Sequence, residues 1–509
     1  MIVALVGLPG AGKTRIGREL AERLHFDFVD TDHLLQQRHG KPAGELFASL
    51  GHARFREEES RVLAEALSGE RRVVSTGGGT ILRPENRQLL RGVRVIGLTA
   101  RDGQLLGRLR GGRGRPVLEP DPVQRLQELR RERGPLYEEV AEAWFWTESA
   151  PSRAVDRIYS FLQLDRLAPG VYFGRGARRH AGAFSGFGKS LLLQQPTVAA
   201  SWGDALVSQL RYGGRQARSV TVPDGDAAKE FSVYAGILSQ AAQFGLGRDE
   251  PVLALGGGAV CDLAGFVAAT YLRGVPLVLL PTTVLAQADA ALGGKTGINL
   301  PEGKNLAGAF YPSRATLIDP EMLRTLPHTT FRDGLSEVVK CGVGLDAALF
   351  AAAERWPRLP AGPQLDYAIG RAAAAKLDIV AEDPLEQSGE RAKLNLGHTV
   401  AHAIEAQTGY AVPHGQAVAI GLAAIARYAQ RRHGFRDAGR VIGVLRRLGL
   451  PTTWSGDPQS LLPYIGRDKK RQAGRLRLVV PQRIGSCELV EVDSDEAYAL
   501  ALMATGENA

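Results

Sequence analysis

Cysteine, aromatic residues and long apolar runs are scarce in this chain of 509 residues. No stretch reaches the roughly 18 consecutive apolar residues of a membrane-spanning helix, so we expect no membrane partner. The three cysteines, Cys261, Cys341 and Cys487, lack the paired spacing of a metal cluster, which favours a reducing, cytoplasmic location. The chain begins directly with a predicted buried strand, so a signal peptide of the usual form is not expected.

A pattern typical of nucleic-acid binding is also missing. The net charge is +9, but the basic residues are dispersed, as in the arginine-rich stretch 108–133, and aromatic residues do not alternate with them. We therefore expect no nucleic-acid partner. The positive charge is interpreted as a solvated surface with local anion-binding sites, which phosphorylated small molecules would occupy.

The length of the chain and the order of its apolar runs predict several domains. A chain of 509 residues is too long for one hydrophobic core, and its length indicates roughly three domains. Up to residue 160, predicted strands at 2–6, 73–75 and 93–98 alternate with helical spacing, as at 14–24. This alternation favours an α/β fold with a parallel sheet wrapped by helices.

The remaining two thirds of the chain divide into a β-rich part and a helical part. No internal repeat relates this second half to the first. A first strand is predicted at 171–174, and helical runs follow at 331–343, 365–382, 398–408 and 414–431. The predicted domains are a phosphate-loop domain at 1–162, a linker at 163–170, an α/β nucleotide-binding domain at 171–327 and an all-helical metal-binding domain at 328–509.

The first fourteen residues, MIVALVGLPGAGKT, contain the most specific motif. A predicted strand runs into a G-x-x-x-x-G-K-[ST] loop and helical spacing follows, which is the context of a phosphate-binding loop. Lys13 would reach the β and γ phosphates of a nucleoside triphosphate, and Thr14 would ligate Mg²⁺. The alternative is a glycine-rich turn that binds nothing. The expected nucleotide contacts are Gly10, Ala11, Gly12, Lys13, Thr14 and Arg15.

Two aspartates, Asp30 and Asp32, follow a short predicted strand. Because they are two residues apart, we expect them to project from the same side of the chain. Asp30 would hold Mg²⁺ through water, and Asp32 would orient or deprotonate an acceptor hydroxyl. A turn at the end of a strand is the alternative.

Arginines and glycines further along the chain would bind the acceptor. Arg56 is suited to clamp a carboxylate through two hydrogen bonds, and the triple glycine at 77–79 permits close approach of a ligand to the backbone. Arg115 lies in a Gly/Arg-rich stretch typical of a mobile lid, and Arg133 adds another cation. Each arginine alone is more often a surface charge, so their order along the chain carries the argument.

That order resembles the shikimate kinase family over about residues 1–160. The matching motifs are the phosphate loop, F-V-D-T-D at 28–32, F-R-E-E-E at 55–59, S-T-G-G-G at 75–79, R-P-V-L at 115–118 and R-x-P-L-Y at 133–137. The resemblance implies ATP-dependent phosphorylation of shikimate, with Mg²⁺ held by Thr14 and, through water, by Asp30. It implies that shikimate is bound by Asp32, Arg56, Gly78 and Arg133, and that the catalytic groups are Lys13, Asp32 and the lid residue Arg115, which would also contact ATP.

A histidine pattern marks the helical part. His398 and His402 are four residues apart on one predicted helical face, and His414 begins the next helix. Upstream, Glu337 and Lys340 are three residues apart on another helix. One Glu and two His are the composition of a catalytic zinc site with open positions, whereas a lone His is more often a core residue.

Glycine turns in the β-rich part are suited to phosphates. The stretch 255–265 reads as a strand, a glycine turn and the start of a helix, but it is not a Rossmann fingerprint, because Cys261 stands where the third glycine would be. The pair Thr282 and Thr283 after a strand, and the G-G-K-T-G run at 293–297, add further donors. Each of these alone is equally consistent with an ordinary turn.

Together these residues resemble the 3-dehydroquinate synthase family over about residues 220–425. The matching motifs are G-G-G-A-V-C-D-L-A-G-F-V-A-A-T-Y-L-R-G, P-T-T, G-G-K-T-G-I-N, G-K-N-L, L-S-E-V-V-K, L-N-L-G-H-T, H-A-I-E and H-G-Q-A-V-A-I-G. The resemblance implies NAD⁺, a Zn²⁺ or Co²⁺ ion, and conversion of 3-deoxy-D-arabino-heptulosonate 7-phosphate to 3-dehydroquinate with release of phosphate. A homodimer formed through this half is also expected.

The resemblance implies a role for each matching residue. The metal ligands would be Glu337, His398 and His414. The NAD⁺ contacts would be Asp224, Gly225, Asp226, Ala227, Ala228, Lys229, Gly258, Ala259, Val260, Cys261, Asp262, Thr282, Thr283, Asp289, Lys295, Lys304, Met322, Leu323, Arg324 and Thr325. The substrate contacts would be Asp262, Arg273, Lys295, Lys304, Asn305, Lys340, Arg391, Asn395, His402 and Lys469, and the catalytic groups Lys295, Lys304, Lys340 and His402, with His402 handling a proton.

The sequence departs from the family at three places. Gln387 and Gln416 stand where glutamate is usual, and the first nucleotide strand, expected near 196–201, lacks the usual acidic turn. Two other functions are considered. One is a glycerol-dehydrogenase-like oxidoreductase behind the kinase, which the motifs G-G-K-T-G-I-N and L-N-L-G-H-T disfavour. The other is a regulatory nucleotide-binding module on a degenerate metal domain, which the intact site residues of both halves disfavour.

Overall fold

The computed structural model describes residues 1–109, 121–148, 150–186, 188–465, 475–493 and 496–506. The chain forms two compact units. The first unit consists of residues 1–164, 179–188 and 208–216, and the second of residues 165–178, 189–207 and 217–509. Each unit contains a sheet of its own.

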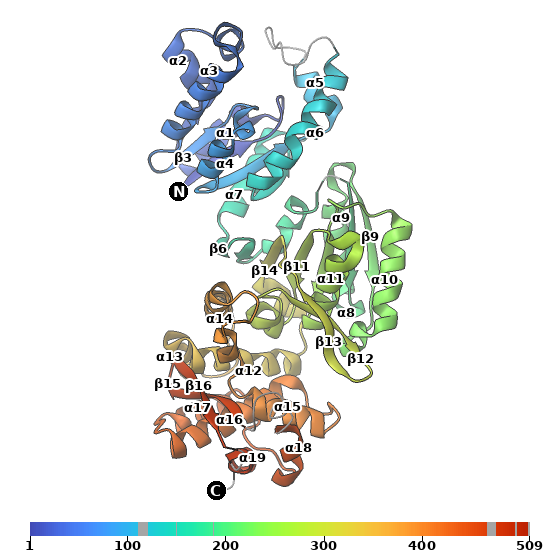
Figure 1. The fold of residues 1–509 in the computed structure, drawn as a ribbon, viewed down its shortest axis with the longest axis vertical. Helices are drawn as coiled ribbons and strands as arrows, with labels where there is room; N and C mark the ends of the chain where they lie inside the picture. Colours follow the sequence, from blue (N-terminus) through green and yellow to red (C-terminus); the bar gives the residue numbers. More distant parts are fainter. Residues whose placement is uncertain (110–120, 149, 187, 466–474, 494–495, 507–509) are drawn as a thin grey trace. The chain divides into compact units, whose positions relative to one another are not determined.

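A five-stranded parallel sheet with the order β2-β3-β1-β4-β5 is the centre of the first unit (Figure 1). Strand β1 is apolar, and its residues 3–6 have no exposed surface, as a central strand with both faces covered requires. The strands are β1 (Ile2–Val6), β2 (Asp27–Asp30), β3 (Arg72–Ser75), β4 (Arg94–Thr99) and β5 (Ala143–Trp146). The alternation predicted for residues 1–160 is confirmed.

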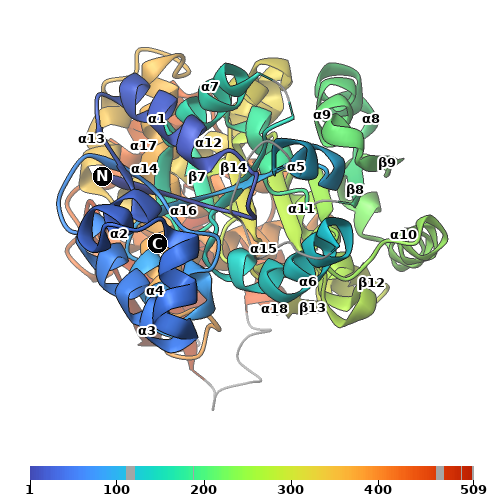
Figure 2. The ribbon, with the colours of Figure 1, turned by 90° about the horizontal axis from the view of Figure 1, so that it is seen from above.

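The helices of the first unit connect these strands. They are α1 (Lys13–Leu24), α2 (Thr31–His39), α3 (Ala43–Ala66), α4 (Pro84–Leu90), α5 (Asp102–Leu109), α6 (Pro122–Val140) and α7 (Pro151–Leu162). Helix α3 packs against α2 and α4 (Figure 2), and α1 packs against α7. Helix α6 begins where the side chain of Asp121 accepts hydrogen bonds from the N–H groups of Val123 and Gln124, with Pro122 at the first position.

A segment from further along the chain, 179–188, belongs to the first unit and covers part of its core. Phe184 is 1% exposed, and its ring centroid lies 5.9 Å from that of Phe161 on α7. The buried ring of His180 lies 5.5 Å from the same Phe161 ring. The apolar face of α7 is therefore buried by residues beyond the predicted domain boundary at 162.

A second segment from further along the chain, 208–216, also belongs to the first unit and covers its core at the end of β5. The guanidinium of Arg215 lies over the ring of Trp146, 5.7 Å from its centroid. Arg215 is 5% exposed and donates to the carbonyl oxygen of Gly182 at 2.7 Å, which joins the two segments. Burial lowers the pKa of Arg215 to about 10.

The second unit has a seven-stranded sheet with the order β6-β7-β14-β11-β10-β8-β9. Strands β7, β14, β11, β10 and β8 run parallel, and β6 pairs antiparallel with β7. The strands are β6 (Asp165–Ala168), β7 (Val171–Phe173), β8 (Lys189–Gln194), β9 (Gln216–Thr221), β10 (Val252–Gly256), β11 (Leu277–Pro281) and β14 (Ala315–Ile318). A separate antiparallel hairpin is formed by β12 (Lys295–Leu300) and β13 (Gly303–Phe310).

Two sequence predictions at the start of this unit are wrong. Residues 163–170 are not a linker, because they contain β6, which pairs with β7. Residues 196–201 are not a strand, because Pro196 begins a helical turn, and the strand expected there is β8, which ends at Gln194. Proline is favoured at the first position of a helix and cannot donate to a sheet, which explains the second error.

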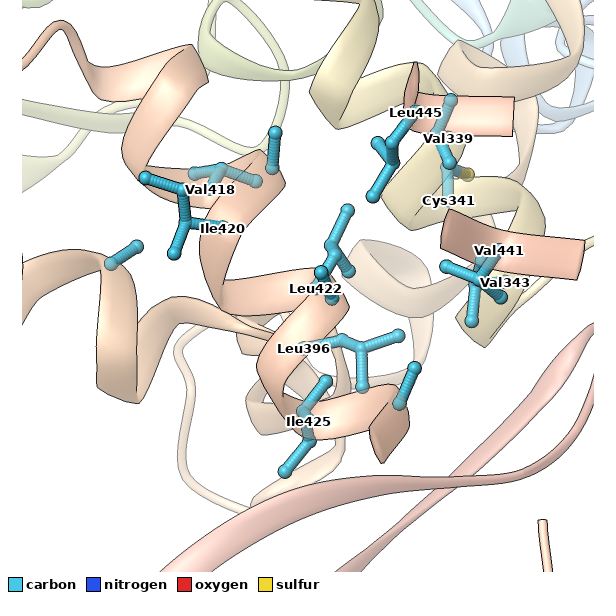
Figure 3. Packing of buried hydrophobic residues seen from close by; sticks show 14 of the residues in the cluster. Val339, Cys341, Val343, Leu396, Val418, Ile420, Leu422, Ile425, Val441 and Leu445 are labelled. Atoms are coloured by element: carbon cyan, nitrogen blue, oxygen red, sulfur yellow. The ribbon is translucent and has the colours of Figure 1, made fainter. Parts of the chain in front are cut away.

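Helices dominate the second unit from residue 328 onward, as predicted. The helices of this unit are α8 (Pro196–Val198), α9 (Asp204–Leu210, which ends in the first unit), α10 (Phe231–Phe244), α11 (Gly258–Thr270), α12 (His328–Gly344), α13 (Ala347–Glu354), α14 (Pro363–Glu382), α15 (His398–Gln407), α16 (His414–Arg432), α17 (Ala438–Arg447), α18 (Leu462–Ile465) and α19 (Glu496–Thr505). Figure 3 shows part of the core between them, to which Leu422 on α16, Val441 on α17 and Val343 on α12 belong. This region also contains a hairpin of β15 (Leu476–Arg483) and β16 (Ser486–Val492), which the sequence analysis did not predict.

None of the described helices is both long enough and apolar enough to cross a membrane. The three cysteines are free thiols and are all buried.

Candidate functional sites

The phosphate loop joins β1 to α1 and has the backbone conformation that its glycines allow. Gly10 and Gly12 have φ values of 82° and 92°, in the left-handed region. A Cβ on Gly7 would lie 2.3 Å from the carbonyl oxygen of Leu98, so only glycine fits there. The ammonium of Lys13 donates to the carbonyl oxygen of Gly7 at 2.8 Å. Because Gly12 is the N-cap of α1, no cap side chain covers the first N–H groups of the helix, and they remain available to an anion.

Asp30 and Asp32 flank the start of α2 and do not lie on one strand. Asp30 ends β2 and accepts a hydrogen bond from the N–H of Asp32 at 3.0 Å, which caps α2. The hydroxyl of Thr14 donates to Asp30 at 2.8 Å, so the two predicted Mg²⁺ ligands lie together. The predicted geometry, with both aspartates projecting from one side of an extended chain, is wrong because the helix begins at Thr31.

A cavity of about 790 Å³ beside the phosphate loop collects the predicted acceptor residues. Arg56 pairs with the buried carboxylate of Glu59 at 2.6 Å. Arg133 donates to the carbonyl oxygen of Gly78 at 2.8 Å. These contacts fix two guanidinium groups at the wall. The predicted site residues that line the cavity are Gly10, Gly12, Lys13, Thr14, Arg15, Asp32, Arg56, Gly78 and Arg133.

Three further residues complete the comparison with the predicted kinase site. Ala11 is 1% exposed and does not line the cavity. Arg108 on α5 lines the cavity and donates to the carbonyl oxygen of Gly10 at 3.2 Å. The sequence analysis missed Arg108, and its only signal was its place just before the Gly/Arg-rich stretch. The predicted lid residue, Arg115, lies outside the described residues.

Glu337, His398 and His414 converge from α12, α15 and α16. One ligand atom from each lies within 4.8 Å of the others. The Nε2 atoms of His414 and His398 lie 3.2 Å and 3.5 Å from Oε1 of Glu337. Nδ1 of His414 contacts Glu405 at 3.2 Å, and Nδ1 of His398 lies 3.3 Å from the carbonyl oxygen of Leu396. These outer contacts orient both rings, as is typical of histidine ligands.

A pair of lysines extends this centre to Asp289. Lys340 lies between two carboxylates, 2.5 Å from Glu337 and 2.8 Å from Asp289. Lys376 on α14 donates to the carboxylate of Asp289 and, at 2.7 Å, to its backbone carbonyl. Lys340 and Lys376 are 5% and 8% exposed. The sequence analysis missed Lys376, because it is a single lysine in an alanine-rich helix without a motif.

Burial and charge pairing compete in this centre. Burial disfavours the charged form of Glu337, but Lys340 and the histidines hold the pKa of its carboxyl well below the usual value. Burial lowers the pKa of His414, whereas Glu337 and Glu405 raise it, to about 10. Burial also opposes the charge on Lys340, yet Asp289 and Glu337 raise its pKa. For Lys376 burial prevails and lowers the pKa, so it loses its proton more readily than Lys340.

His402 lies one turn along α15 from His398. The ring centroids of the two histidines are 5.2 Å apart, and His402 is exposed. It therefore borders the Glu–His–His cluster without being part of it.

The glycine turn between β10 and α11 has the predicted form of a strand, a turn and a helix start. A Cβ on Gly256 would lie 2.8 Å from the side chain of Val260, so the turn is tightly packed. The predicted cofactor contacts Gly258 and Ala259 lie at the start of α11. Val260 and Cys261 are 0% and 2% exposed, so their side chains belong to the core.

Two threonines follow β11, the strand adjacent to β10. The hydroxyl of Thr282 is buried and has no hydrogen-bond partner among the described residues. The hydroxyl of Thr283 accepts from the N–H of Ala286 at 3.1 Å. Because parallel strands end at the same edge of a sheet, these threonines and the glycine turn lie at one edge.

Charged residues from three elements meet beside the start of α11. Lys229 pairs with Asp262 at 2.6 Å and contacts the side-chain oxygen of Asn305. Lys304 on β13 pairs with Asp226. The remaining predicted contacts in this segment are Asp224, Gly225, Ala227 and Ala228, which form a short turn that ends at Lys229.

Other predicted substrate residues have partners of their own. Arg391 is 1% exposed and donates to the carbonyl oxygens of Pro384 and Gly293 at 2.9 Å and 3.0 Å. Lys295 pairs with Glu386 at 2.7 Å. Arg273, in a left-handed conformation with φ of 63°, and Asn395 are exposed. Lys469 lies outside the described residues.

The predicted contacts at 322–325 form a short turn. Met322 and Leu323 are 1% and 4% exposed, so their side chains belong to the core. Arg324 and Thr325 are exposed, and the hydroxyl of Thr325 accepts from the indole N–H of Trp202 at 3.0 Å.

The two glutamines at usual glutamate positions also have partners. Gln416 donates to the carboxylate of Asp333 at 3.1 Å, a bond that a glutamate could not make. The backbone N–H of Gln387 donates to Asp383 at 2.7 Å, which organises the loop before Arg391.

Three family models match consecutive parts of the chain. The shikimate kinase model matches residues 9–163. Models of the N-terminal and C-terminal parts of 3-dehydroquinate synthase match residues 219–333 and 334–471. The order is the one predicted from the motifs.

Curated relatives support the second assignment. A 3-dehydroquinate synthase of Nostoc punctiforme is 42% identical over 318 residues, which cover 60% of this chain and 87% of the relative. The chain belongs to the 3-dehydroquinate synthase family. A second synthase, from Symbiobacterium thermophilum, is 40% identical over 348 residues, which cover 66% of this chain and 97% of the relative. A shikimate kinase domain precedes the synthase. We call the first unit the kinase half and the second unit the synthase half.

A solved structure shares the fold of the synthase family. The 2-epi-5-epi-valiolone synthase of Streptomyces hygroscopicus, with NAD⁺ and Zn²⁺ bound, aligns with a TM-score of 0.60 and 28% identity. The alignment covers 67% of this chain and 98% of that protein. Membership of the synthase family favours a synthase over the glycerol-dehydrogenase-like alternative.

Proposed function

We propose that both halves are active in one pathway. The kinase half phosphorylates shikimate with ATP, and the synthase half converts 3-deoxy-D-arabino-heptulosonate 7-phosphate to 3-dehydroquinate with release of phosphate. The observation that carries the proposal is that each family match contains an assembled site. The cavity beside the phosphate loop holds Arg56 and Arg133, and Glu337, His398 and His414 converge next to Lys340.

In the kinase half, the cavity residues divide between the two substrates. Lys13 and the start of α1 bind the phosphates of ATP. Arg56 and Arg133, which the wall holds in place, bind the carboxylate of shikimate. Asp32 accepts the proton of the attacking hydroxyl. Thr14 and Asp30, whose oxygens are 2.8 Å apart, fit a Mg²⁺ ion, which offsets phosphate charge.

In the synthase half, the donor set fits a divalent metal. Two imidazole nitrogens and one carboxylate oxygen are the ligands of catalytic zinc sites, and Co²⁺ accepts the same set. The proton held on His414 is one that a metal would replace. When bound, Zn²⁺ or Co²⁺ would polarise a substrate hydroxyl.

The glycine turn and Thr282 fit NAD⁺. The start of α11 offers N–H groups to a pyrophosphate, and the buried hydroxyl of Thr282 offers a group that still needs a partner. When bound, NAD⁺ would accept a hydride and return it, so that the reaction has no net redox change.

The charged side chains of the synthase half would bind and orient the sugar phosphate. Lys340 and Lys376, fixed by Asp289, present two ammonium groups beside the metal ligands. Arg391 and Asn395 precede α15, which would carry the metal ligand His398, and His402 would move a proton at the edge of the metal site. Lys295 and Lys304 would turn from Glu386 and Asp226 to the substrate.

A paired assay of the whole chain tests the proposal. ATP with shikimate should give ADP and a phosphorylated product, and the heptulosonate phosphate with NAD⁺ should release phosphate without accumulation of NADH. Steady NADH formation would instead support the oxidoreductase alternative, and failure of both assays would contradict the proposal.

His398→Ala tests the metal site directly. We expect loss of bound metal, measured by elemental analysis, together with loss of phosphate release, because two ligands remain. Kinase turnover of the same sample is the internal control. Retention of metal and phosphate release would refute the site.

A homodimer through the synthase half and a location in the cytoplasm stay predictions. Light scattering of the whole chain at several concentrations would measure the assembly, and a monomer at all concentrations would contradict the first prediction.

A further inference from the structure

The buried hydroxyl of Tyr137 contacts two loops beside the kinase cavity, the phosphate loop and the loop at 77–79. Tyr137 lies on α6, is 1% exposed and does not line the cavity. Its oxygen lies 2.6 Å from the carbonyl oxygen of Gly78, in the acceptor loop at 77–79. It also lies 3.0 Å from the carbonyl oxygen of Gly7, where the phosphate loop begins.

Each of these carbonyls also accepts a hydrogen bond from a cation of the site. Lys13 donates to Gly7 at 2.8 Å, and Arg133 donates to Gly78 at 2.8 Å. Arg133 and Tyr137 are four residues apart on α6, so they lie on the same face of the helix. Tyr137 therefore shares one acceptor with the nucleotide-binding lysine and another with the shikimate-binding arginine.

A phenol hydroxyl carries one proton and donates to one carbonyl at a time. The shorter distance indicates that the hydroxyl donates to the carbonyl oxygen of Gly78. Burial raises the pKa of Tyr137 far above neutrality, although Arg133 opposes this, so the proton is always present.

We propose that Tyr137 is a positioning residue that couples the nucleotide site to the shikimate site through this single proton. The proposal rests on the proposed kinase function. Phosphates that draw Lys13 from Gly7 leave that carbonyl dependent on Tyr137. A carboxylate that draws Arg133 from Gly78 leaves the Gly78 carbonyl dependent on Tyr137 in the same way. The two carbonyls then compete for the one proton of Tyr137, so Tyr137 makes each ligand weaken the binding of the other. Thermodynamic linkage requires this effect to be the same in both directions.

Tyr137→Phe in the whole chain tests this coupling. The variant keeps the ring and its edge contact with Trp144, whose centroid is 6.4 Å away, and removes only the hydroxyl. Calorimetry gives the shikimate Kd with and without saturating MgADP. The ratio of the shikimate Kd without MgADP to the Kd with MgADP should be about threefold larger in the variant than in the wild type. A factor of this size corresponds to one neutral hydrogen bond. An equal ratio, or a change in the opposite direction, would overturn the proposal.

Tyr159→Phe is the matched control, because Tyr159 lies on α7 and its ring contacts Arg23 outside the cavity. Its ratio should equal that of the wild type. A purely structural role for Tyr137 would lower the thermal midpoint and leave the ratio unchanged. If the wild type binds neither ligand, the proposed kinase function fails, which is a distinct result.

A second substitution keeps the proposal testable if Tyr137→Phe does not fold. A 3-fluorotyrosine placed at position 137 keeps the shape and makes the hydroxyl a stronger donor. The effect of MgADP on the shikimate Kd should then move opposite to that in Tyr137→Phe. No change would contradict the proposal.

Discussion

The kinase half and the synthase half hold the cations of their sites in different ways. In the kinase half, Lys13 and Arg133 donate to backbone carbonyls at the edge of a large cavity. In the synthase half, Lys340 is 5% exposed and lies between the carboxylates of Glu337 and Asp289. A carbonyl that loses one of its donors stays neutral, whereas a buried carboxylate that loses its cation keeps a full charge. Removing a cation from the kinase site should therefore abolish activity with little loss of stability, whereas removing one from the synthase site should reduce both.

Lys340→Met should have the largest effect. It leaves Glu337 and Asp289 with one buried cation fewer, which costs about 3–5 kcal/mol of folding free energy, and it should abolish phosphate release. Denaturant unfolding of the synthase half measures the first effect and a phosphate assay the second. Kinase turnover should be unchanged, and unaltered unfolding would break the comparison.

Lys13→Ala should abolish shikimate phosphorylation with little effect on the fold. The half-buried ammonium donates to two neutral backbone carbonyls, one of which still has the Tyr137 hydroxyl 3.0 Å away after its removal, so we expect a change of less than about 1 kcal/mol in unfolding free energy. Turnover and denaturant unfolding are measured on the same sample. A destabilisation as large as that of Lys340→Met would show that the two sites do not differ.

Phe184→Ala should destabilise the kinase half selectively. The 1% exposed ring packs on Phe161, so its removal should cost about 3 kcal/mol. The unfolding of each half is followed by the loss of its own activity during heating. Phe231→Ala is the matched control, because Phe231 is 60% exposed and belongs to the synthase half. Equal loss in both halves would contradict the assignment of 179–188 to the kinase unit.

His180 should make the stability of the kinase half depend on pH. Burial, together with Arg157 and Arg179, lowers the pKa of His180 to about 4 from 6.5, while Ser160 lies 3.4 Å from its Nε2. The folded state therefore holds a neutral ring that the unfolded chain would protonate. The stability is fully present above pH 6.5 and is lost as the pH falls from 6.5 toward 4. Thermal midpoints across this range should fall less in His180→Gln, and parallel curves would contradict the prediction.

Local patterns predicted the elements that carry most of the chemistry. The glycine loop at 7–14 and the helices that begin at His398 and His414 follow from short motifs whose structure is decided by neighbouring residues. Their convergence in space, as for Glu337 with the two histidines, agrees with what the family resemblance implied.

Contacts between distant residues were beyond local patterns. Lys376 has no motif, and only the fold brings it to Asp289. Asp30 and Asp32 were misplaced because a helix begins between them, a boundary that spacing alone does not show. Pro196 was read within a strand, although the structure uses it to start a helix. The linker predicted at 163–170 failed because β6 pairs with β7 rather than standing alone.

The segments at 179–188 and 208–216 affect how the kinase half folds during its synthesis on the ribosome. The kinase family match ends at 163, yet the unit includes residues up to 216. At about 5–20 residues per second, the nascent kinase waits several seconds for its last segment, with Phe161 and Trp146 uncovered. During that interval an unfinished core is exposed to chaperones and to other nascent chains. Cutting the gene at the family boundary would make this transient state permanent.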